Sequence, residues 1–153
     1  MEYIAAALPA KKTIALIAHD NKKPDLLSWV AKHKALLEHH HLCGTGTTGG
    51  KVATALGLQV KQFLSGPLGG DQQIGSKIAE GKIDCLIFFW DPFTQMPHDP
   101  DVKALLRLAA VWNIPIACNS ASADLIISSP LFNSPLERMI PNYDSYKNKR
   151  EQL

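Results

Sequence analysis

A glycine- and proline-rich segment near the middle of the chain carries a single carboxylate that could remove a proton. It reads Ser65-Gly66-Pro67-Leu68-Gly69-Gly70-Asp71 and has neither a strand nor a helix pattern. Its glycines would let backbone N–H groups approach an anion. Asp71 could cap the helix that follows, as aspartate often does, or act as a general base beside a bound substrate. The preceding pair Gly69-Gly70 favours the base.

A second glycine-rich segment resembles two phosphate-binding motifs and matches neither. Gly44-x-Gly46-x-x-Gly49 has the spacing of a dinucleotide fingerprint, but it follows the second predicted strand, and no acid ends the third. Residues 45–51 nearly form a P-loop, but Thr45 replaces its first glycine and Val52 its metal-binding hydroxyl. Glycine N–H groups, threonine hydroxyls and a helix N-terminus still favour an anion. We therefore predict that Thr45, Gly46, Thr47 and Thr48 bind phosphate; the alternative is a plain helix cap.

Two further polar segments follow apolar runs. His19 could donate to a carbonyl oxygen or simply bond to nearby backbone, and Lys23 could contact the phosphate or lie in solvent. Asp91 ends the most apolar run and is followed by proline, which favours a role in the site.

His98 lies in a polar segment near acids, where its proton could be tuned near neutrality. Asp101 could belong to the site or only favour the first turn of a helix. His98, Asp99 and Asp101 are close in sequence, but the chain has no i, i+4 histidine pair or cysteine cluster, so we predict no metal.

The apolar patterns predict alternating strands and helices. Strands are expected at residues 13–18, 41–43, 58–64, 85–90 and 114–117, and helices at 24–37, up to Gly57, at 74–79, from Asp99 and at 122–128. This alternation predicts a single-domain α/β fold, a doubly wound five-stranded parallel sheet with helices on both faces. The domain covers 1–153, with 1–10 and 141–153 as terminal extensions, and no regular element is expected beyond residue 130. The polar segments would gather at the carboxyl edge of the sheet.

Composition narrows the possible partners and the compartment. The net charge is +2 and aromatic residues make up 7% of the chain, which speaks against nucleic-acid or membrane binding. The three cysteines, Cys43, Cys85 and Cys118, are scattered and predict a reducing compartment. With no targeting segment or long apolar run in view, we expect a cytoplasmic protein.

These segments together resemble the methylglyoxal synthase family. The matching residues are Ala18-His19-Asp20, Thr45-Gly46-Thr47-Thr48-Gly49, Ser65 to Gln73, Phe88-Phe89-Trp90-Asp91-Pro92, and Pro97 to Arg107. The resemblance implies the fold predicted above. It also implies a homo-oligomer, typically a hexamer, that converts dihydroxyacetone phosphate to methylglyoxal and inorganic phosphate with no metal or organic cofactor. Inhibition by phosphate is implied as well.

The resemblance also implies residue roles. Asp71 matches the catalytic acid/base, and His98 matches the histidine that acts on the substrate oxygens. Asp91 and Asp101 match acids beside the active site, and Arg150 an arginine that reaches the phosphate of a neighbouring subunit. The substrate pocket is expected to contain His19 and the phosphate-binding residues Lys23, Thr45, Thr47, Thr48, Ser65 and Gly66.

A second function class shares the fold. The allosteric domain of carbamoyl phosphate synthetase is similar and binds phosphate-like effectors without chemistry. A sensor of this kind needs hydrogen-bond donors but no base, so Asp71, Asp91 and His98 favour the enzyme.

Overall fold

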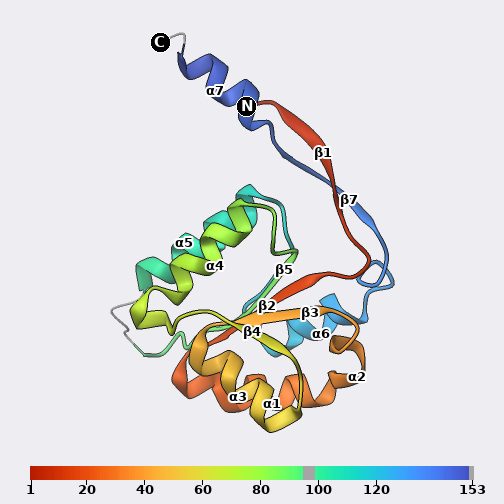
Figure 1. Cartoon of the computed structure of the whole chain (residues 1–153), viewed down its shortest axis with the longest axis vertical. Helices are drawn as coiled ribbons and strands as arrows, with labels where there is room; N and C mark the ends of the chain where they lie inside the picture. Colours follow the sequence, from red (N-terminus) through yellow and green to blue (C-terminus); the bar gives the residue numbers. More distant parts are fainter. Residues whose placement is uncertain (95–98, 152–153) are drawn as a thin grey trace.

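Five parallel strands form the central sheet, in the order β4-β3-β2-β5-β6 (Figure 1). The computed structural model describes residues 1–94 and 99–151. The strands are β2 (Thr13–Ala18), β3 (His41–Gly44), β4 (Val60–Gln62), β5 (Cys85–Phe89) and β6 (Ile116–Ala117). The chain winds outward from β2 to one edge and then from β5 to the other. The carboxyl ends of β2 and β5 therefore mark the switch point where ligands bind in such sheets.

Helices cover both faces of this sheet, which confirms the predicted fold (Figure 1). One face packs on α1 (Lys23–Lys32), α3 (Gly46–Leu56) and α6 (Ser120–Ser128), and the other on α4 (Gly70–Ala79) and α5 (Asp99–Val111). Alternation along β2 explains both layers, because Ile14 and Leu16 join the first core cluster while Ala15 and Ile17 join the second. None of the described helices is long and apolar enough to cross a membrane.

Several element boundaries differ from those predicted. The single helix expected over 24–37 is two, α1 and the short α2 (Lys34–Leu37), separated at His33, whose backbone angles of φ −108° and ψ 15° are not helical. Strands β4 and β6 are shorter than expected.

Most of the glycine-rich segment after β3 is helical. Helix α3 begins at Gly46, with Thr45 as its N-cap. A Cβ on Gly44 would lie 2.6 Å from the carbonyl oxygen of Leu16, and one on Gly46 would lie 2.8 Å from that of Phe63. These glycines therefore serve close packing of the helix start against neighbouring strands.

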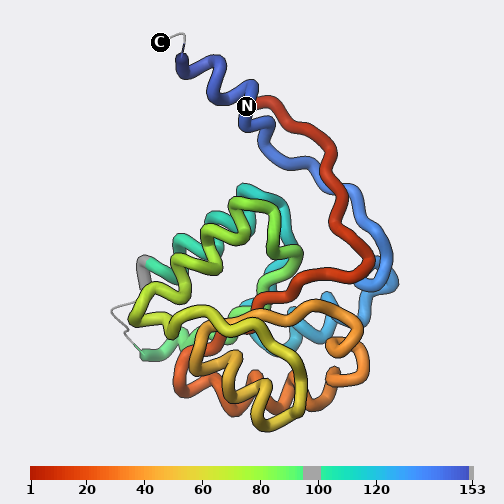
Figure 2. Tube along the Cα trace, viewed as in Figure 1, coloured from red at the N-terminus to blue at the C-terminus, as the bar shows by residue number. Residues whose placement is uncertain are grey.

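The two ends of the chain pair with each other, which the sequence analysis did not predict. Strand β1 (Tyr3–Leu8) runs antiparallel to β7 (Leu136–Pro141), and α7 (Tyr143–Glu151) follows. Figure 2 shows these elements as an arm that leaves the body, with both termini at its outer end. Whether residues 1–10 and 141–153 are extensions of one domain stays a prediction, but the expectation of no regular element beyond residue 130 is wrong.

Candidate active site

Three polar segments meet in a small cavity beyond the carboxyl ends of β2, β3 and β4. The cavity has a volume of about 250 Å³. Its polar lining comprises His19, Asp20 and Lys23 after β2, Thr45 and Thr47 after β3, and Ser65, Gly66 and Asp71 after β4. Its volume falls below the range of about 300–1,000 Å³ usual for drug-sized ligands, which suits a small substrate.

Asp71 lies in the first turn of α4 and faces this cavity. The N-cap of α4 is Gly69, at φ +99°, so the interpretation of Asp71 as the cap is wrong. A Cβ on Gly66 would lie 3.2 Å from Oδ2 of Asp71, which places the carboxylate against the turn that begins at Ser65. Its Oδ1 atom is buried. A Cβ on Gly70 would lie 1.9 Å from the carbonyl oxygen of Leu64, so only glycine lets the chain deliver Asp71 here.

His19 is held by backbone on two sides. The backbone N–H of His19 donates to the carbonyl oxygen of Phe89 over 3.1 Å, and the ring atom Nδ1 of His19 accepts a hydrogen bond from the backbone N–H of Asp91 over 3.1 Å. Because Nδ1 is an acceptor, the proton of the neutral ring is on Nε2. The ring also lies edge-on to Phe88, with centroids 5.4 Å apart. His19 therefore bonds to nearby backbone, as one of its two expected roles requires, and it also lines the cavity. Its donation to a carbonyl oxygen stays a prediction.

Asp91 is buried and holds the loop after β5 in place. Its carboxylate accepts hydrogen bonds from Asn21 Nδ2 at 3.0 Å, Thr94 Oγ1 at 2.7 Å and the backbone N–H of Phe93 at 3.0 Å. These donors lower the pKa of Asp91 to about 2, with Asn21 contributing most. Asp91 does not line the cavity. These contacts support a positioning role for Asp91, and its expected place among the residues of the site stays a prediction.

Lys23 lines the cavity, and two hydrogen bonds fix the position of its ammonium group. Its side chain is 11% exposed, and its Nζ donates to Thr47 Oγ1 over 3.1 Å and to the carboxylate of Asp20. The ammonium lowers the pKa of Asp20. Sequence analysis missed Asp20 as a site residue, as it missed Asn21 and Thr94. The available signal for Asp20 was its position directly after His19, in the segment that follows β2.

Two residues predicted to bind phosphate do not line the cavity. The hydroxyl of Thr48 donates to the carbonyl oxygen of Ala18 over 3.4 Å, and the N–H of Gly46 donates to that of Leu64 over 3.1 Å. These groups tie the start of α3 to neighbouring segments. The first-turn N–H groups of Thr47 and Thr48 have no intrahelical acceptor by position and remain suited to an anion.

Asp101 borders a second cavity of about 200 Å³, which Asp71 also lines. Gln72 Nε2 donates to Asp101 Oδ1 over 2.9 Å and so joins α4 to α5 beside the site. The predicted residue His98 lies outside the described residues.

Arg150 lies on α7, at the end of the arm, where its guanidinium packs over the ring of Tyr146 at 5.3 Å. Figure 1 shows α7 away from the loops that form the cavity. The structure therefore does not bring Arg150 to the cavity of its own chain.

Comparisons with known proteins show which proteins the chain resembles. The MGS-like domain family matches residues 25–118. Methylglyoxal synthase from Cellvibrio japonicus is 60% identical over 152 residues and covers 99% of both chains, and that from Saccharophagus degradans is 64% identical over 95% of both. The crystal structure of methylglyoxal synthase from Elizabethkingia anophelis NUHP1 is similar at a TM-score of 0.89 and 55% identity, covering 94% of this chain and 95% of that one.

Proposed function

The chain belongs to the methylglyoxal synthase family, and on this premise we propose which of its residues carry out the reaction. The activity is that of a carbon–oxygen lyase, which converts dihydroxyacetone phosphate to methylglyoxal and inorganic phosphate through an enediolate. The regulatory alternative is not favoured, because these full-length relatives are named as the enzyme.

Lys23, Thr45, Thr47 and Ser65 hold the phosphate group of the substrate. All four line the same cavity, and the hydrogen bond from Lys23 to Thr47 points the ammonium at the start of α3. The positive end of the helix dipole and the first-turn N–H groups add to the attraction of an anion there.

Asp71 removes a proton from the hydroxymethyl carbon. The electron pair of that C–H bond forms the carbon–carbon double bond, and negative charge develops on the carbonyl oxygen. The neutral His19 ring donates its Nε2–H to this oxygen, a kind of stabilisation worth about 3–4 kcal/mol per donor. His98 is predicted to act on the substrate oxygens as well. We propose that His98 and Asp101 take part in the remaining proton transfers.

Phosphate leaves in the second step. The C1 hydroxyl of the enediolate loses its proton, the C1–O electrons form the aldehyde C=O bond, and the carbon–carbon double bond shifts to C2–C3 as the C–O bond to phosphate breaks. The phosphate donors stabilise the leaving group. The resulting enolate takes up a proton at its methylene carbon and becomes methylglyoxal. The C–O bond must stand across the enediolate plane for this step, so the site must hold the phosphate out of that plane. No step calls for a metal or an organic cofactor.

The observation that carries this mechanism is the carboxylate of Asp71 in the cavity that also holds His19 and Thr47. We expect Asp71→Asn to lower kcat by about 10²–10⁴-fold, the usual contribution of a positioned base, and to leave the Kd for inorganic phosphate unchanged. Asp25→Asn is the matched control, since Asp25 is exposed, pairs with Lys22 and lies outside the cavity. The assay follows methylglyoxal release in the presence of a chelator. Near-full turnover by Asp71→Asn would show that Asp71 is not the base.

The exposed apolar surface of the arm supports a homo-oligomer, which we propose is a hexamer. Tyr3, Ile4, Met139 and Tyr143 each expose 46–64% of their surface there. Packing against another copy would cover these side chains and could bring Arg150 to the phosphate site of that copy. Inhibition by phosphate follows if the product binds where the substrate phosphate does.

The cysteines support a cytoplasmic location. Cys43, Cys85 and Cys118 are all free, as expected in a reducing compartment. Burial raises the pKa of Cys43 and of Cys85 to about 12, which keeps both thiols unreactive.

A further inference from the structure

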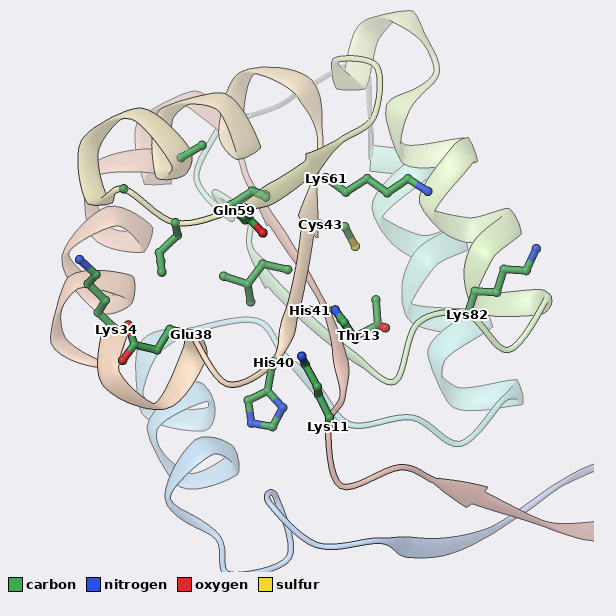
Figure 3. Close-up of a pocket in the computed structure, with 15 residues that line it drawn as sticks. Lys11, Thr13, Lys34, Glu38, His40, His41, Cys43, Gln59, Lys61 and Lys82 are labelled. Carbon is green, nitrogen blue, oxygen red and sulfur yellow. The ribbon is translucent and has the colours of Figure 1, made fainter.

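A larger cavity lies at the opposite edge of the sheet, where β2 and β3 begin. Its volume is about 1080 Å³, and it contains none of the residues assigned to the reaction (Figure 3). Strand β2 runs from Thr13 at this cavity to Ala18 beside the active site. Six residues of strand span about 20 Å, so a single small substrate cannot occupy both places.

Positive charge is concentrated around this cavity. Lys11, Lys34, Lys61 and Lys82 line it together with a single acid, Glu38, which gives a formal charge of +3. The whole chain carries only +2, so the rest of the molecule is slightly acidic. Such a local excess of one sign attracts small anions.

Three of these lysines, Lys11, Lys34 and Lys61, form no ion pair within residues 1–94 and 99–151. Lys61 also lies over the ring of Phe63 at 5.5 Å. Lys82 pairs with Glu80 at 2.8 Å. Figure 3 shows Lys11 beside Thr13 and His41, with Lys61 and Lys82 on the same side of the cavity.

The large cavity has polar side chains between these lysines and adjoins a second, smaller cavity. An adjoining cavity of about 150 Å³ shares Thr13, Cys43, Lys61 and Lys82 with the large one. Thr13, Gln59, His40 and His41 add polar side chains to the lining, and Leu42 and Val60 are among its apolar residues. Lysine ammoniums bind phosphate as point charges, and their spread around this cavity suits several charged groups better than one.

We propose that this cavity is a second anion site, which binds a small molecule carrying two or more phosphate groups through Lys11, Lys61 and Lys82. The site is independent of the reaction assigned above. Inorganic tripolyphosphate is the probe, and its binding is measured by isothermal titration calorimetry on the whole protein.

The titration separates the two sites by substitution. We expect the wild-type chain to bind tripolyphosphate at two classes of site. The double variant Lys11→Gln/Lys61→Gln binds about tenfold or more weakly at one class, the loss expected when charge-assisted hydrogen bonds are removed. Lys23→Gln weakens only the other class. We expect the double variant to convert dihydroxyacetone phosphate at the wild-type rate. The charge-matched double control Lys147→Gln/Lys149→Gln, on α7, should bind as the wild type does.

Two results of the titration would overturn the proposal. One is wild-type binding of tripolyphosphate by the double variant, and the other is a single class of site that Lys23→Gln abolishes. A measurement on the wild-type chain adds an independent readout, because bound tripolyphosphate should protect Lys11 and Lys61, but not Lys147, from acetylation detected by mass spectrometry. Equal acetylation with and without the probe would also overturn it. Loss of turnover in Asp71→Asn bears on the reaction alone and leaves this site untouched.

Discussion

Asp91 and His19 are joined by a hydrogen bond in which the backbone N–H of Asp91 donates to Nδ1 of His19 over 3.1 Å. The bond connects the segments that follow β2 and β5, the two strands at the switch point of the sheet. A proton on Nδ1 would remove the acceptor and set two donors against each other, so the bond favours the neutral ring. The Asp91 side chain in turn is held by Asn21 and Thr94.

This relationship predicts a kinetic effect for Asp91→Asn. The amide can accept only part of what the carboxylate accepts, and its NH₂ group would oppose the donor of Asn21. We expect kcat to fall by about 10–100-fold through misplacement of His19, with a smaller change in KM. Steady-state kinetics measure this, and ¹⁵N NMR of the His19 ring reports whether its tautomer is still fixed. Asp144→Asn, on the arm, is the control; an unchanged kcat and tautomer in Asp91→Asn would contradict the positioning role.

The depressed pKa of Asp91 predicts how stability responds to acid. Its folded-state value of about 2 lies below the ordinary value of 3.8, so the folded protein binds fewer protons than the unfolded chain between these limits. The stabilisation is therefore complete above about pH 5 and is lost as the pH falls toward 2. The difference in free energy of unfolding between wild type and Asp91→Asn, measured with urea, should stay constant from pH 7 to 5 and shrink below pH 4. A difference that grows on acidification would show that the sign is wrong.

Thr47 and Thr48 are adjacent but have different tasks, which a pair of substitutions separates. Thr47 lines the cavity and accepts from Lys23, whereas the hydroxyl of Thr48 donates to the backbone of Ala18. Thr47→Val should raise KM and the Kd for inorganic phosphate about tenfold, as expected for a lost hydrogen bond to a charged group. Thr48→Val should keep KM and lower the free energy of unfolding by about 1 kcal/mol. The reverse pattern would show that Thr48 faces the phosphate.

The parallel sheet was predictable because its two central strands, β2 and β5, are apolar runs. Residues 13–18 and 85–89 have this pattern, and each strand passes buried side chains to both core clusters. Topology then requires the carboxyl ends of the strands to meet, so the neighbourhood of His19 and Asp71 could be inferred without contacts.

The remaining features depend on contacts between distant segments. Nothing near Tyr3 in the sequence reveals its pairing with Pro141, because register across a long loop has no local signal. Similarly, Asp91 ends an apolar strand as a catalytic acid could. Its hydrogen bonds in the structure, among them one from Asn21 in the segment after β2, show that its carboxylate is already engaged.

The position of Arg150 at the tip of the arm predicts complementation between subunits. If it completes the phosphate site of a neighbouring copy, Arg150→Ala and Asp71→Asn inactivate different parts of a shared site. Each variant alone should be nearly inactive, and oligomers refolded from an equal mixture should recover about a quarter of the wild-type sites, since half of the chains have each intact partner. Turnover of the mixture against each variant alone measures this, and light scattering confirms that the hybrids assemble. If assembled hybrids stay as inactive as the separate variants, Arg150 does not act across the subunit boundary.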